Sequence, residues 1–222
     1  MSSERIIEIL QMLPSATLET VYMTLASTLF ACLLGFPLGI YLYVASPLGL
    51  APHNLLYRTV SRVVNLLRSI PFIILMVLLI PFTRFIIGTS IGPSATIVPL
   101  SIAAAPFVAR ITETALSEVD SGGITAALAM GSTKRQIVRK VLIPEAMPAL
   151  ISALALTIIN LIAYSAMAGA IGGGGLGDLA IRYGFHRFQT DVTIGAVIVI
   201  LILVETVQFG GTLISRRLLS KR

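Results

Sequence analysis

The sequence is poor in the side chains that enzymes most often use for chemistry. Only 12% of its 222 residues are charged, and it has one cysteine, Cys32, and two histidines, His53 and His186. A single cysteine excludes an intrachain disulfide and a cysteine-rich metal site. The histidines are far apart in sequence and are expected on opposite faces of a membrane, which argues against a shared zinc or general-base site. We therefore predict no catalytic, metal or cofactor site.

The sequence also lacks a phosphate-binding loop. No segment matches G-x-x-x-x-G-K-[S/T], so we do not expect the chain to bind or hydrolyse ATP by that route. Gly172, Gly174 and Gly177 do spell G-x-G-x-x-G, but the dinucleotide motif follows a strand, whereas these glycines follow an apolar helix. We expect a flexible glycine-rich turn at the external mouth, where Asp178 and Arg182 either contact a partner or are simply solvated.

Apolar residues make up most of what is present. Hydrophobic side chains form 56% of the chain and the mean hydropathy is +0.94, far outside the range of soluble proteins. A spanning helix needs about 20 apolar residues. We predict an all-α polytopic membrane protein whose residues 1–222 form one transmembrane domain with five transmembrane helices. The predicted spans cover residues 18–44, 69–87, 93–109, 150–171 and 192–214.

The basic residues predict the orientation of these spans. The net charge of +6 does not indicate nucleic-acid binding, because most basic residues flank apolar spans. With the N-terminus outside and the C-terminus in the cytoplasm, twelve basic residues are cytoplasmic, namely Arg58, Arg62, Arg68, Arg110, Lys134, Arg135, Arg139, Lys140, Arg216, Arg217, Lys221 and Arg222. Four are outside, namely Arg5, Arg84, Arg182 and Arg187.

Two further features concern the N-terminus and symmetry. Ile6, Ile9, Leu10 and Leu13 recur at helical spacing before Pro14, which predicts a short interfacial helix, and Glu4 and Glu8 argue against a cleaved signal. No internal repeat is evident, so the two-fold arrangement of an alternating pathway must come from a second copy of the chain.

The longest cytoplasmic connection, residues 121–148, has the pattern of a docking element. Gly131 separates a short small-residue helix from a second helix, which Ser132 or Thr133 can cap. Pro144 either ends that second helix or opens the next span. The second helix has an apolar stripe of Ile137, Val138, Val141 and Leu142 and a basic face of Lys134, Arg135, Arg139 and Lys140. Such a helix either lies on anionic lipid or fills a groove on a partner protein, and two helices hinged by a glycine favour the partner.

This segment resembles the cytoplasmic coupling loop of ABC-importer permeases. Those permeases carry Glu-Ala-Ala, a glycine four residues later, then nine residues before Ile-x-Leu-Pro. Here Ala126, Ala127 and Gly131 match, with Val141, Ile143 and Pro144 at the tail, while Thr125 replaces the glutamate and leaves any salt bridge of that glutamate without its partner. The segments LYRTVSRVVNLLRSIPFIIL, IPFTRFIIGTSIG, IVPLSIAAAPFVAR, GSTKRQIVRKVLIPEAMPAL and YSAMAGAIGGGGLGDL resemble, in addition, the permease subunit of bacterial methionine importers.

The resemblance implies a multi-pass protein of the bacterial inner membrane that imports methionine, in the L and also the D form, by alternating access. It implies a homodimer on two copies of a soluble ATPase, supplied by an extracytoplasmic methionine-binding lipoprotein. Nothing in composition or spacing identifies methionine, so another small amino acid is an alternative substrate. The implied ATPase-coupling residues are Ala126, Ala127, Met130, Gly131, Ser132, Lys134, Arg135, Val141, Ile143 and Pro144.

Polar residues within the predicted spans are candidates for the translocation pathway. Asn160 and Tyr164 share a helical face and, with flexible Met167, are predicted to line the gate; helix-to-helix hydrogen bonding is the alternative. Glu205 lies well inside the last span and is either a proton relay or gate contact, or a carboxyl that faces the bundle near Gln208. A relay there would make the protein a proton-coupled carrier instead.

Gly35 and Gly39 form a small-xxx-small pair in the first span. Such a pair predicts close helix packing rather than chemistry.

Overall fold

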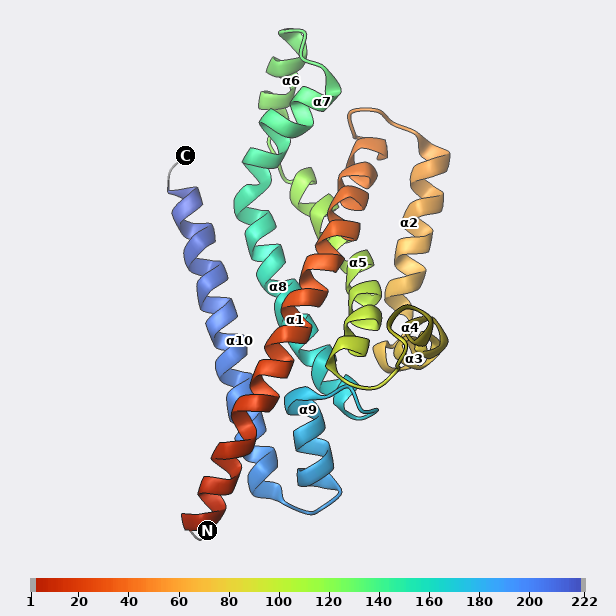
Figure 1. The fold of residues 1–222 in the computed structure, drawn as a ribbon. Helices are drawn as coiled ribbons and strands as arrows, with labels where there is room; N and C mark the ends of the chain where they lie inside the picture. The colour runs from red at the N-terminus through yellow and green to blue at the C-terminus, as the bar shows by residue number, and fades with distance from the viewer. Residues whose placement is uncertain (1–2, 221–222) are drawn as a thin grey trace.

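The computed structural model describes the backbone of residues 3–220 and the side chains of residues 8, 9 and 11–220. Within that part all regular structure is helical, which confirms the predicted fold class (Figure 1). The helices are α1 (Ser3–Ala45), α2 (Asn54–Ser69), α3 (Phe72–Leu78), α4 (Ile80–Ile87), α5 (Pro93–Ser117), α6 (Ser121–Ala129), α7 (Lys134–Ile137), the π-helix η1 (Val138–Leu142), α8 (Ile143–Gly169), α9 (Gly175–Leu179), the π-helix η2 (Ala180–Phe185) and α10 (Thr190–Leu219).

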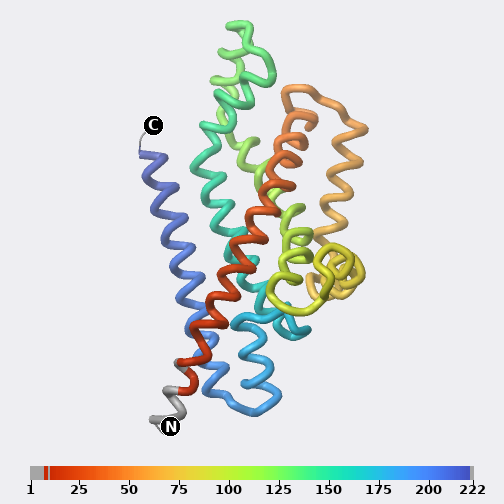
Figure 2. The backbone as a smooth tube through the Cα atoms, viewed as in Figure 1, coloured from red at the N-terminus to blue at the C-terminus, as the bar shows by residue number. Residues whose placement is uncertain are grey.

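Four helical segments of the described chain are long and apolar enough to cross a membrane, and α2 with α3 forms a fifth if a bent pair counts as one span. The four are Gln11–Ala45, Pro93–Ser117, Lys134–Gly169 and Thr190–Leu219. Figure 2 shows that α1 starts and α10 finishes at opposite ends of the bundle, as an odd number of spans requires.

The second predicted span was wrong in its shape. It was expected to run straight through residues 69–87, but α2 begins at Asn54 and stops at Ser69, and α3 leaves it at a bend of 100°. Ile70 has an extended backbone (ψ 124°) because the following Pro71 disfavours the α conformation before it. The short helices α3 and α4 follow, and Gly88 ends α4 in the left-handed region (φ 84°).

Several other boundaries also differ. The interfacial helix expected before Pro14 is not a separate element, because α1 continues through Pro14 to Ala45, and the side chains of Ile6 and Leu10 lie outside the described ones. The third span continues past residue 109 to Ser117. Pro144 opens α8 rather than ending a helix, since a proline in a first turn costs no backbone hydrogen bond.

The two glycines of α1, Gly35 and Gly39, pack closely against α5, as predicted. A Cβ added to Gly35 would lie 2.5 Å from the carbonyl oxygen of Ala105, and one added to Gly39 would lie 2.5 Å from that of Ala109. The backbones of α1 and α5 therefore approach closely at two points, Gly35 and Gly39, about one helical turn apart. Beside this contact, Leu42 and Ala109 are fully buried together with Val64 of α2, which fixes the position of α2.

The glycine-rich turn before α9 is held tightly, which corrects the prediction of flexibility. Gly172, Gly174 and Gly175 have φ values of 82°, 83° and 76°, so the turn needs glycine. The carboxylate of Glu19 accepts a hydrogen bond from the Gly175 amide at 2.7 Å, and the Thr20 hydroxyl accepts one from the Leu176 amide at 2.9 Å. These two side chains of α1 replace the cap that α9 lacks, because its N-cap is a glycine.

Candidate coupling and translocation sites

Residues 121–148, here called the coupling segment, begin with α6 and the turn that follows it. The amide of Gly131 donates to the carbonyl of Leu128 and the amide of Ser132 donates to that of Ala127. Together with φ 77° at Gly131, these bonds form a Schellman motif, which needs a left-handed residue. A Cβ added to Gly131 would meet nothing within 4 Å, so the backbone conformation alone requires the glycine.

The second half begins with a capping box. Of the two candidate caps it is Thr133 that caps α7: its hydroxyl accepts from the amide of Gln136, and the Gln136 side chain accepts from the Thr133 amide at 2.8 Å. The predicted apolar stripe faces inward, with Ile137 and Leu142 fully buried. It packs in one cluster with Ala127 of α6, Tyr43 of α1 and Leu116 of α5.

The segment forms a tip that protrudes from one end of the bundle (Figure 1). Its outer surface combines apolar and basic side chains: Met130 is 80% exposed and Leu128 is 50% exposed. The predicted coupling residues Ala126, Met130, Gly131, Lys134, Arg135 and Pro144 are exposed, Ser132, Val141 and Ile143 are half-buried, and Ala127 is buried. The exposed members lie on the surface of the segment, whereas Ala127 packs α6 against α7.

Two of the predicted pathway residues line one pocket. Asn160 and Tyr164 of α8 border a space of about 270 Å³ together with residues of α2, α3 and α5. The Tyr164 ring stacks on Phe72 of α3, with centroids 4.7 Å apart and planes 5° from parallel. This stack fixes the ring at the wall of the pocket.

Arg68 lines the same pocket, which the sequence did not indicate. It was predicted to be a charge at the cytoplasmic surface; it is exposed in the single chain, but its guanidinium borders the pocket and lies 5.9 Å from the centre of the Phe107 ring. The signal that was overlooked is the helical spacing of Tyr57, Val60 and Val64, which pack towards α1 and α5.

Met167 and Glu205 lie outside that pocket lining. Met167 is 49% exposed and lies on the same face of α8 as Asn160 and Tyr164. Glu205 is exposed on α10, and the expected hydrogen bond to Gln208 is absent among the described residues, since Gln208 points to Thr212 four residues further on. The structure therefore gathers Asn160, Tyr164 and Met167 on one face and leaves Glu205 apart.

A second polar group was also missed. The buried carboxylate of Glu113 on α5 accepts hydrogen bonds from Arg110 at 2.6 Å and from the Tyr57 hydroxyl at 3.0 Å. The Arg110 guanidinium also donates to Ser61 at 2.7 Å and to Asn65 at 2.9 Å. Arg110 was expected to be a surface charge after the third span; instead the network joins α2 to α5.

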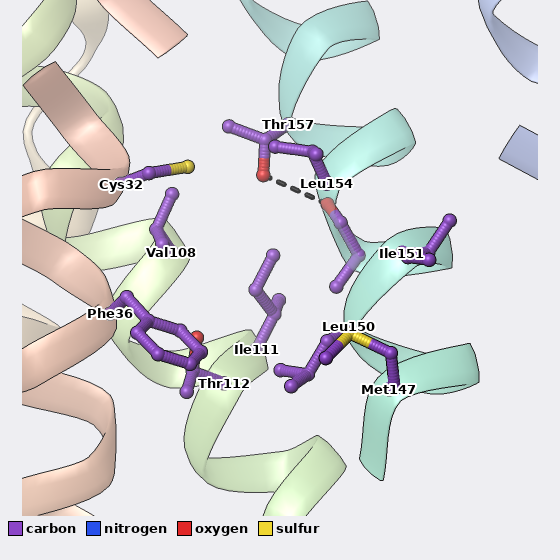
Figure 3. A pocket seen from close by; sticks show the side chains of 11 residues that line it. Cys32, Phe36, Val108, Ile111, Thr112, Met147, Leu150, Ile151, Leu154 and Thr157 are labelled. Carbon is purple, nitrogen blue, oxygen red and sulfur yellow. Dashed lines mark hydrogen bonds between the residues drawn. The ribbon is translucent and has the colours of Figure 1, made fainter. Parts of the chain in front are cut away.

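An apolar pocket separates the first half of α8 from α1 and α5. Figure 3 shows Leu150, Leu154 and Thr157 of α8 facing Phe36 and Val108 across a space of about 190 Å³. The lining is almost entirely hydrocarbon, so the pocket offers no polar group to orient a solute. The pocket borders α8 from Met147 to Thr157, in the first half of the helix.

The remaining predicted residues lie at the ends of the bundle. Asp178 and Arg182 form an ion pair with each other one turn apart. His53 caps α2 by accepting from the Leu56 amide, while the His186 ring lies against that of Phe185. The connection between η2 and α10 and the connection between α1 and α2 lie at opposite ends of the bundle (Figure 1). Neither histidine is near the pocket of Asn160 and Tyr164.

Comparison with known proteins gives consistent matches. Residues 35–220 match the family described as binding-protein-dependent transport system inner membrane component. The probable D-methionine transport system permease protein MetI of Vibrio cholerae is 47% identical over 206 residues, which are 93% of this chain and 92% of that protein. The D-methionine transport system permease protein MetI of Escherichia coli K12 is 56% identical over 151 residues, 68% of this chain and 70% of that protein.

The fold is also found in solved structures. A chain of the inward-facing MetNI methionine ABC transporter is 48% identical to this chain, with a TM-score of 0.93 over 98% of this chain and 99% of the other. A chain of an amino acid ABC transporter that is only 21% identical still gives a TM-score of 0.79, and this likeness concerns the fold alone.

Proposed function

Because this chain belongs to the family of binding-protein-dependent transport system inner membrane components, we propose that it is the permease subunit of an ATP-driven importer of methionine. The observation that carries the proposal is the α6–α7 tip, an exposed docking surface on a helical membrane protein that has no phosphate loop of its own. The relatives named for D-methionine transport support methionine as the substrate, and we extend the proposal to the L form.

The proposed partners follow from the same features. ATP hydrolysis takes place on a separate ATPase chain, of which two copies meet the tips of two permease copies. Met167 is 49% exposed on the same face of α8 as Asn160, which fits a pathway completed by a second copy. An extracytoplasmic methionine-binding lipoprotein delivers the substrate to the end of the bundle opposite the tip.

The proposed orientation places the tip in the cytoplasm, with the N-terminus outside. The tip, the α1–α2 connection and the end of α10 all lie at one end of the bundle (Figure 1). Lys134 and Arg135 in the tip and Arg216 and Arg217 in α10 put basic residues at that end. Clustering of Lys and Arg on one side supports the cytoplasmic assignment.

The proposed mechanism is alternating access, with α8 as the lever. One uninterrupted helical segment, Lys134–Gly169, carries the capped start of α7 at one end and Asn160, Tyr164 and Met167 near the other. A movement that the ATPases impose on Lys134 and Arg135 is therefore transmitted to the pathway face. The apolar pocket beside Leu150 and Leu154 gives the lever space to tilt.

A proton-coupled carrier is not favoured. Its one candidate relay, Glu205, is exposed on α10 and has no hydrogen-bond or ion-pair partner in the described part of the chain. A relay needs a second titratable or hydrogen-bonded group to pass the proton on.

The substrate is tested by uptake of radiolabelled L-methionine into vesicles that contain the permease, its ATPase and its binding protein. We expect unlabelled L-methionine and D-methionine to compete and other small amino acids to compete weakly. If another amino acid competed more strongly than methionine, that amino acid would become the proposed substrate.

A further inference from the structure

The pocket between α2, α3, α5 and α8 is lined by three polar groups that have no hydrogen-bond partner in the described part of the chain. Within the described residues, the Arg68 guanidinium, the Asn160 amide and the Tyr164 hydroxyl make no hydrogen bond, although all three line the same space. Polar groups in a membrane domain are normally hydrogen-bonded, because lipid offers no substitute for water. Arg68 is exposed and Asn160 and Tyr164 are half-buried, so the three groups border an accessible space in which a ligand can supply the missing bonds.

Arg68 defines the charge of that ligand. Its guanidinium is permanently positive, and none of the residues that line the pocket is acidic. The ring of Phe107, 5.9 Å from the guanidinium carbon, holds the side chain by a cation–π contact without neutralising it. The planar fork of donors is suited to a carboxylate, which it can bind with two parallel hydrogen bonds.

The other walls define the rest of the ligand. Phe72, Leu75 and Phe107 present aromatic and aliphatic surfaces, and the stack of Phe72 on Tyr164 keeps two of the rings fixed. A flexible apolar chain or a thioether packs well against such rings. The side-chain oxygens of Asn160 and Tyr164 can accept hydrogen bonds from an ammonium group. The volume of about 270 Å³ is small for a ligand pocket and suits one amino acid.

We propose that this pocket is a transient binding site for a neutral amino acid in the membrane domain, with the α-carboxylate on Arg68 and the apolar side chain against Phe72 and Phe107. The inference rests on the proposed function, because it assumes that an amino acid passes along the face of α8. It adds that the permease itself recognises the carboxylate, so that the pathway is selective and not a plain conduit.

The test uses a photoreactive methionine analogue with a diazirine in its side chain and intact carboxylate and amino groups. The assembled complex is irradiated with this probe, the chains are separated, and labelled peptides of the permease are mapped. We expect label in the peptides that contain Phe72, Phe107 or Tyr164. Methionine should compete for labelling, whereas methioninol, which lacks the carboxylate, should not.

Variants of α2 provide the matched comparison. Arg68→Gln should reduce this labelling about 10- to 100-fold, as expected for loss of a hydrogen-bonded charged partner. Arg68→Lys should retain part of it, because it keeps the charge but loses the fork. Arg62→Gln removes an equal charge from an exposed position on the same helix that does not line the pocket, and should label like the wild type.

Two results would overturn the inference: equal labelling of the Arg68→Gln and Arg62→Gln complexes, or equal competition by methionine and methioninol. Failure of the proposed function gives a different result, because the wild-type complex would then not accumulate methionine at all. A wild-type complex that imports methionine, with a pocket that is not labelled, contradicts the inference alone.

Discussion

Glu19 and Gly175 are joined by a hydrogen bond of 2.7 Å from the Gly175 amide to the Glu19 carboxylate, although 156 positions separate them in the chain. The bond ties α1 to the start of α9 and fixes the glycine-rich turn. We predict that Glu19→Ala destabilises the protein by about 1–2 kcal/mol, the lower end for a bond to a charged group, because Glu19 is exposed. Thermal unfolding of the detergent-purified complex should shift down by a few degrees. Glu118→Ala, at an exposed carboxylate at the end of α5, should leave the transition unchanged.

The contact of α1 with α5 predicts a strong effect of one added methyl group. A Cβ at Gly39 would lie 2.5 Å from both the Ala109 carbonyl oxygen and the Thr112 Cβ, so Gly39→Ala must push the helices apart, at a cost of about 1–3 kcal/mol. Gly210→Ala is the control, since nothing lies within 4 Å of its added Cβ and alanine favours a helix over glycine. Lower thermal stability is expected for the first variant only. Equal stability of the two would show that the helices do not pack at Gly39.

The Arg110–Glu113 pair predicts coupling between α2 and α5. Glu113→Gln leaves the Arg110 charge half-buried without its counter-ion, which we expect to cost about 3 kcal/mol. Arg110→Gln should be similarly harmful. The double variant should recover part of the loss, because both charges are then removed, so the effects of the single variants will not add. Additive losses in thermal unfolding would mean that the two residues act independently.

The turn at Gly131 predicts a graded series. Because φ is 77° and space is free, Gly131→Asn should dock to the ATPase almost as the wild type does, whereas β-branched Gly131→Val should strain the turn by about 1–2 kcal/mol, or about tenfold in docking. Co-purification with the ATPase and methionine uptake should fall together in the valine variant while its insertion into the membrane stays normal. Wild-type docking by the valine variant would remove Gly131 from the coupling role.

Much of the fold was predictable because a helix that spans a membrane needs a long run of apolar residues. Long apolar runs located α1, α5, α8 and α10, and glycine spacing predicted the tight α1–α5 contact. The capping candidates and the apolar stripe of Ile137 and Leu142 also folded as predicted, since these signals are local.

The pocket of Arg68, Asn160 and Tyr164 was less predictable because its residues come from distant segments. The three arginines of α2 make this helix resemble a polar surface segment. Arg68 is therefore recognised as a pocket residue only once α2 is packed against α5. Glu19 likewise shows no local signal, because its partner Gly175 follows another span. Pro71 was the one local clue to the bent second span, and a count of apolar residues does not register it.

The central claim, that an external ATPase drives this chain through the α6–α7 tip, is tested most directly by methionine accumulation in vesicles. The chain is reconstituted alone and with its ATPase and binding protein, and labelled methionine is followed with ATP and without it. We predict accumulation against the gradient only when all components and ATP are present. Uphill accumulation by the chain alone, driven by a proton gradient, would contradict the account.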